Sequence, residues 1–120
     1  MASSGIQTFV GGVNTGVTAL AGGANSASTP VMSSGVNVVS VCATAGDSVR
    51  LPANIPQGGT VMVVNTSAAT LDIFPNSGAT INAGTADSEK GIATLTGATF
   101  VQVGATGLTW VADNLIAKQS

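Results

Sequence analysis

Residues 60–74 read TVMVVNTSAATLDIF and contain the two patterns that decide the fold. The first run, Thr60 to Asn65, is almost wholly apolar and β-branched, which predicts a strand covered on both of its faces. The second run, Thr70 to Phe74, alternates polar and apolar residues, as a strand with one buried face does. Pro75-Asn76-Ser77-Gly78 follows directly and has the composition of a turn. This part of the chain is therefore predicted to be strand, connection, strand and turn.

Similar runs lie on both sides of this stretch. About eight short strands separated by Gly- and Pro-containing turns are predicted between Val36 and Ala112, which is typical of a sandwich or barrel. The only helical candidate, Thr18 to Ala24, is short and interrupted by Gly22-Gly23. The sequence thus predicts an all-β chain. The remaining predicted strands are Val36–Thr44, Ser48–Leu51, Ala79–Asn82, Ile92–Thr96, Ala98–Val103 and Leu108–Ala112.

The first 35 residues have a different composition, rich in Gly, Ser, Ala and Asn. Such a segment buries too little apolar surface to offset its chain entropy alone. We therefore expect residues 1–35 to form a largely irregular N-terminal arm, and residues 36–120 a single β-sandwich domain with a short C-terminal tail. The arm either orders against another surface or adds an edge strand to its own assembly. Its spaced apolar residues are Ile6, Phe9, Val10, Val13, Val17 and Leu20.

Composition excludes several classes of function. Only 7% of the 120 residues are charged, against roughly 25% in a typical soluble domain. The three basic residues are too few and too scattered to bind nucleic acid. One cysteine and no histidine cannot build a zinc site. The apolar runs are far shorter than a membrane-spanning helix needs, and the first residues do not resemble a signal peptide. We expect a protein made in the cytoplasm that binds neither nucleic acid nor membrane.

Candidate catalytic groups are weak. Cys42 lies in a valine-rich run with no histidine to activate it, so a buried structural thiol is favoured over a nucleophile. A carboxylate pair for sugar hydrolysis, or a calcium site around Asp87 and Glu89, is disfavoured against turn and surface roles. No enzyme activity, cofactor or metal is expected. The acidic residues weighed are Asp47, Asp72, Asp87, Glu89 and Asp113.

Scarce charge is itself informative. A soluble monomer normally carries many surface charges of both signs. With so few, and with an apolar run such as Val61 to Val64, much of the surface is expected to be covered by other subunits. A monomer kept soluble by hydroxyl and amide groups is the alternative.

Residues 37–112 resemble a family of small bacteriophage virion proteins. The most specific element is the F-P-x-x-G-x-x-I-N pattern from Phe74 to Asn82. Members are similar to head decoration, or cement, proteins with a jelly-roll β-sandwich and are commonly trimeric. The other matching segments are Thr44–Pro52, Val63–Asn65, Ala98–Phe100 and Thr109-Trp110.

The resemblance implies a non-enzymatic virion subunit that binds the major capsid protein as a homotrimer on the outside of the head. We expect the arm and the C-terminal segment to make the partner contacts. A receptor- or glycan-binding module of a tail or head fibre is the alternative function. Trp110 and Phe74 are expected to be packing anchors. The predicted interface residues are Ile6, Phe9, Val10, Val13, Leu115 and Ile116.

Overall fold

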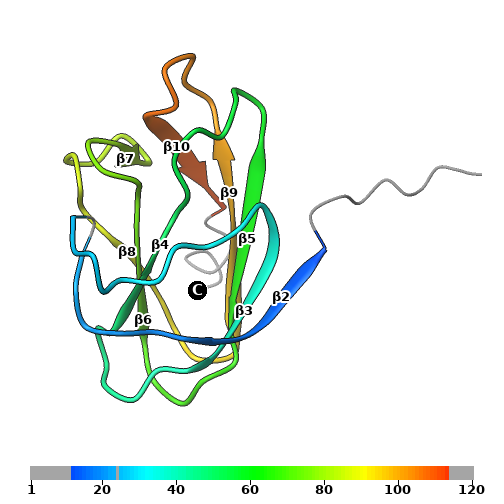
Figure 1. Cartoon of the computed structure of the whole chain (residues 1–120), viewed down its shortest axis with the longest axis vertical. Helices are drawn as coiled ribbons and strands as arrows, with labels where there is room; N and C mark the ends of the chain where they lie inside the picture. The colour runs from blue at the N-terminus through cyan, green and yellow to red at the C-terminus, as the bar shows by residue number, and fades with distance from the viewer. Residues whose placement is uncertain (1–11, 24, 114–120) are drawn as a thin grey trace, which may run out of the picture.

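The computed structural model describes residues 12–23 and 25–113. Every regular element in this part of the chain is a β-strand, which confirms the predicted all-β class. The strands form two sheets (Figure 1). They are β2 (Val13–Thr18), β3 (Gly35–Val41), β4 (Ser48–Arg50), β5 (Thr60–Asn65), β6 (Leu71–Phe74), β7 (Thr80–Ile81), β8 (Lys90–Ile92), β9 (Thr96–Gln102) and β10 (Thr109–Ala112).

The larger sheet has six strands in the order β2-β3-β5-β9-β10-β7, and the smaller has the order β4-β6-β8. From β3 to β6 the strands alternate between the two sheets, and each strand pairs parallel with the preceding strand of its own sheet. β2 pairs parallel with β3, β3 with β5, and β4 with β6. Single bridges from Leu20 to Ser48 and from Val31 to Arg50 bring the first turn against the smaller sheet. This winding is solenoid-like.

The later strands close the structure by antiparallel pairing. β8 pairs antiparallel with β6, β9 with β5, and β10 with β9. The predicted jelly-roll connectivity is not confirmed, because a jelly roll is assembled from antiparallel Greek keys whereas β2 to β6 wind in parallel. Alternating hydrophobicity fixes which face of a strand is buried, but it does not fix which strand lies beside it.

A single core fills the space between the sheets. Trp110 and Phe100 from the larger sheet and Leu71 and Ile73 from the smaller one are fully buried. Trp110 is thus a packing anchor, as predicted, whereas Phe74 is only half-buried. Eighteen buried hydrophobic residues form this cluster: Val17, Ala19, Met32, Val39, Cys42, Val49, Leu51, Val61, Val63, Leu71, Ile73, Ala79, Ile81, Ile92, Ala98, Phe100, Trp110 and Ala112.

The described residues before position 35 contact the strands that follow them. β2 pairs with β3, and Val17, Ala19 and Met32 belong to the common core. Residues 13–23 and 25–35 therefore pack against the rest of the chain, with β2 as the one strand that ends before β3 begins. One expectation was that this segment adds an edge strand to its own assembly. Within its own chain, the segment supplies the edge strand β2.

Buried amides connect the successive turns. Asn37 on β3 donates to the carbonyl oxygens of Ser33 and Met62, and its Oδ1 accepts a bond from Asn14 Nδ2 at 3.2 Å. The Oδ1 also accepts from the backbone N–H and the hydroxyl of Ser33. Asn65 on β5 has a similar role and donates to Ala69 O at 2.8 Å. Because both amides are fully buried, these bonds offset the cost of removing them from water.

One predicted strand is wrong. Residues 92–96 were expected to form a continuous strand, but β8 ends at Ile92 and β9 begins at Thr96. Leu95 between them has φ 60, a left-handed conformation that turns the chain. The turn is held by the N–H of Leu95, which donates to Asn65 O at 2.7 Å. The local composition favours a strand, but the hydrogen bond from Leu95 to Asn65 holds the chain in a turn instead.

Candidate interaction surface

Apolar side chains gather on the outer side of the larger sheet. Alternation along β5 turns Val61 and Val63 inward and Met62 and Val64 outward. The pairing register carries the same alternation to the neighbouring strands, so their outward residues meet in rows. We call the following residues the valine face: Val13, Val36, Val38, Met62, Val64, Val101 and Val111.

The rows of the valine face follow directly from the register. Val13 pairs with Val36, and Val36 with Met62. Met62 in turn pairs with Thr99. A second row joins Thr60, Val101 and Val111 across β5, β9 and β10.

Three residues of the valine face are exposed in the described structure, and the other four are half-buried. Val13 is 60% exposed, Met62 37% and Val111 47%. The strand Thr60–Asn65 was predicted to be covered on both faces, yet only its inner face is covered by the described chain. Its outer side, with Met62 exposed and Val64 half-buried, has no cover among the described residues.

Of the predicted interface residues, Val13 alone lies within the described part of the chain. It begins β2 and stands at one edge of the valine face, in line with Val36. Ile6, Phe9, Val10, Leu115 and Ile116 lie outside the described residues. Sequence reasoning missed the rest of the valine face, although the apolar run over Thr60–Asn65 was the signal that pointed to it.

The motif that carries the virion resemblance has a structural role. In the turn after β6, Gly78 has φ 82, a conformation that glycine adopts without strain. Asn76 accepts a bond from Trp110 Nε1 at 2.7 Å and donates to Gly107 O at 3.1 Å. Asn82 Oδ1 accepts from the backbone N–H of Ala112 at 2.8 Å. The two asparagines of the motif therefore fix the end strand β10 and its tryptophan.

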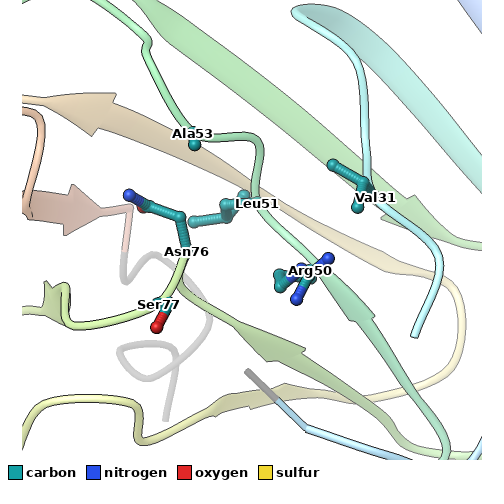
Figure 2. A pocket seen from close by; sticks show the side chains of 6 residues that line it. All are labelled: Val31, Arg50, Leu51, Ala53, Asn76 and Ser77. Atoms are coloured by element: carbon teal, nitrogen blue, oxygen red, sulfur yellow. The ribbon is translucent and has the colours of Figure 1, made fainter. Parts of the chain in front are cut away.

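A pocket of about 280 Å³ lies beside β4 and the turn after β6 (Figure 2). It is half open. Its amide and hydroxyl groups already have partners within the chain: Asn76 binds Trp110 and Gly107, and Ser77 Oγ donates to Asn25 Oδ1 at 2.5 Å. The lining does not select a ligand. It consists of Val31, Arg50, Leu51, Ala53, Asn76 and Ser77.

Cys42 has the environment of a structural thiol. It is buried, and its Sγ donates to the carbonyl oxygens of Thr44 and Thr70, each at 3.4 Å. Burial, and next the negative charge of Asp47, raise the pKa of the thiol above its ordinary value. The protonated form is therefore favoured at neutral pH, which is the opposite of what a cysteine nucleophile needs.

The acidic residues are spread over turns. Asp47 Oδ2 accepts the N–H of Thr44 at 3.2 Å, the turn role predicted for it. Asp87 Oδ1 accepts the N–H of Gly78 at 2.6 Å, so this carboxylate also holds a turn. Among residues 12–23 and 25–113, no three cysteine or acidic side chains gather in a way that would hold a metal ion. The same residues contain no helix with the length and apolar character needed to cross a membrane.

Comparison with known proteins adds no relative. No protein-family model matches the chain, and no curated protein matches it at a significant level.

Proposed function

We propose that this chain is a structural subunit of a bacteriophage virion, a capsid decoration protein that assembles as a homotrimer on the outside of the head. The observation that carries the proposal is the valine face, an uncharged aliphatic surface on a small protein with very little charge elsewhere. Monomeric proteins rarely expose a contiguous apolar patch of this kind unless a partner covers it.

The resemblance to decoration proteins supplies the kind of assembly. It is carried by the F-P-x-x-G-x-x-I-N element, whose asparagines hold β10 in place. The proposal needs two sheets around one core and does not depend on jelly-roll connectivity. In this role the protein stabilises the head mechanically, because a trimer that contacts several capsid subunits adds multivalent binding free energy to strained joints.

The fibre alternative is less well supported. Sugar-binding surfaces usually present aromatic rings to the ligand, and among the described residues Trp110 and Phe100 are fully buried. Phe74 is the remaining described aromatic residue, and it is half-buried.

Copy number in purified virions tests the proposal. A decoration protein should be present in a number that matches sites of the capsid lattice, and antibody labelling should cover the head. A few dozen copies or fewer, located at the tail or in fibres, would contradict it and support the fibre alternative.

The attachment segment is testable separately. In the proposed protein the residues before β2, with Leu115 and Ile116, bind the capsid, whereas Val13 belongs to β2. Deleting residues 2–11 leaves every described strand intact. The truncated protein should remain folded and fail to bind undecorated heads. Normal decoration by this variant would move the attachment site onto the sheets.

A further inference from the structure

The valine face exposes aliphatic side chains and carries no charge, and this chemistry restricts what can bind to it. We infer that it is the contact between copies of this chain, so that the larger sheets of the subunits turn their outer sides toward a common axis inside the oligomer. This inference rests on the homotrimer of the proposed function and assigns its interface. It leaves the terminal segments for the capsid.

The first argument is the distribution of charge. The strands of the larger sheet contain no Asp, Glu, Lys or Arg, and the charged strand residues Arg50, Asp72 and Lys90 all belong to the smaller sheet. Around a threefold axis, each residue near the axis lies close to its own copies, so a charge there would meet a like charge. An uncharged face has no such repulsion and is compatible with itself.

The second argument is area. Five strands spaced about 4.8 Å apart and about 20 Å long present about 500 Å². Three such faces, turned toward a common axis, bury about 1,500 Å² in one trimer, which is comparable to the total area that a specific interface buries. Thr60 and Thr99 lie among the aliphatic residues and supply hydroxyl groups that hydrogen bond without adding charge.

The third argument is availability. An open aliphatic sheet face promotes aggregation until it is covered. Another copy of the same chain is present at the same concentration whenever the chain is made, whereas an assembled head is not. Three copies around a threefold axis, each with its valine face turned inward, would cover all three faces in a closed assembly.

A matched pair of valines provides the test. Val111 lies on the valine face and is 47% exposed, and Val31 lies on the pocket side and is 49% exposed. Val111→Glu and Val31→Glu thus add the same charge to the same residue type at the same exposure. Sedimentation velocity at about 10 µM, where mass action favours an oligomer of ordinary affinity, gives the mass of each.

We expect the wild-type chain and Val31→Glu to sediment as trimers, and Val111→Glu as a monomer, a roughly threefold loss of mass. Circular dichroism and thermal melting check that each variant folds. If Val111→Glu does not fold, Val111→Thr combined with Met62→Gln replaces it, since neither change adds charge or much volume. The double variant should dissociate at a concentration at least tenfold above that of the wild type.

Salt dependence gives a second reading. An interface without charges should dissociate at nearly the same concentration in about 0.05 M and about 1 M NaCl, because there is little for salt to screen. A wild-type monomer, a trimeric Val111→Glu, or equal dissociation of both glutamate variants would each overturn the inference. A wild-type monomer that becomes an oligomer when residues 2–11 are deleted would identify the chain's own segment as the cover.

The inference and the proposed function can fail independently. The sedimentation experiment contains no capsid, so the interface stands or falls without it. A trimer that Val111→Glu dissociates but that is absent from virion heads would leave the interface and remove the decoration role. Monomers attached singly to heads would leave the decoration role and remove the interface.

Discussion

The outer sides of the two sheets are built from different residues. On the larger sheet, outward positions are valine, methionine and threonine, and its described strands contain no charged residue. On the smaller sheet, each of the strands β4, β6 and β8 carries one charged residue, and the adjoining turns add Asp47, Asp87 and Glu89. Both sheets bury the same kind of inner face. The two sheets therefore differ in their outer sides and not in the core that they share.

Size separates the sheets as well. The smaller sheet has short strands of three or four residues, whereas β3 and β9 of the larger sheet have seven each. Longer strands side by side make a broader surface, and only a broad surface can bury enough area to hold a partner. The broader sheet is also the one without charge.

The largest expected effect comes from the core that both sheets share. Trp110→Ala removes the largest fully buried side chain and should lower the free energy of unfolding by about 3–5 kcal/mol. Chemical denaturation followed by circular dichroism measures the loss. Both sheets should unfold together in one transition, because one core cluster supports them both.

Trp110→Phe sharpens this result. It keeps an aromatic ring in the core but leaves Asn76 Oδ1 without the indole N–H that it binds. The expected cost is about 1–3 kcal/mol, that of an unpaired buried acceptor. Equal stability of the phenylalanine variant and the wild type would show that the hydrogen bond from the F-P-x-x-G-x-x-I-N turn contributes nothing.

Sequence patterns were sufficient for much of the fold. The strands over Ser48–Arg50, Thr60–Asn65, Leu71–Phe74 and Thr109–Ala112 were predicted within one residue at each end. Each has β-branched residues and is bounded by Gly, Pro or Asn, so local information determines it. The turn role of Asp47 was predicted from the same local chemistry.

The arrangement of those strands was not predictable. Parallel pairing of β3 with β5 joins residues about 25 positions apart, and nothing in either strand alone names its partner. The same limit explains residues 13–35, whose low hydrophobicity favoured an irregular arm. Their few apolar residues are buried because the rest of the fold offers them a core, which is tertiary information.

The sequence predicted that the protein has an apolar surface for a partner, but not which residues form that surface. Scarce charge and the apolar run over Thr60–Asn65 predicted covered surface, and the structure shows which face of that strand lacks a cover. That face gathers residues from five strands, and only the pairing register brings them together.

The next largest effect concerns the amides under the larger sheet. Asn37→Ala removes a side chain that makes five hydrogen bonds beneath the valine face. We expect a loss of about 2–4 kcal/mol in the free energy of unfolding, since buried partners are left unpaired. Denaturant titration gives the value.

Asn14→Ala is the matched control for this change. It removes only the bond from Asn14 Nδ2 to Asn37 and leaves the others intact. The expected loss is below about 1 kcal/mol, because Asn14 is only half-buried and its single bond is partly replaced by water. If the two variants lose the same stability, the network does not act through Asn37.

The smallest effect belongs to the smaller sheet and depends on pH. Burial, and next the negative charge of Glu89, raise the pKa of the Asp72 carboxyl above its ordinary value of 3.8. Between the ordinary and the raised pKa, the folded chain binds more protons than the unfolded chain, so the free energy of unfolding falls as pH rises through this interval. At neutral pH the whole penalty is present, and below the ordinary pKa it has disappeared.

Asp72→Asn should therefore be slightly more stable than the wild type at pH 7, and the difference should vanish as pH falls toward 3.8. The effect is small because the carboxyl is partly exposed and solvent screens it. Glu89→Gln should lower the pKa of Asp72 only in part, since burial is the larger cause. Thermal melts of the three proteins between pH 3 and pH 7 measure both changes. If the melting temperatures of the wild type and Asp72→Asn follow parallel curves against pH, this carboxyl titrates alike in the folded and unfolded chain. The charged side of the molecule would then be as well hydrated as its composition suggests.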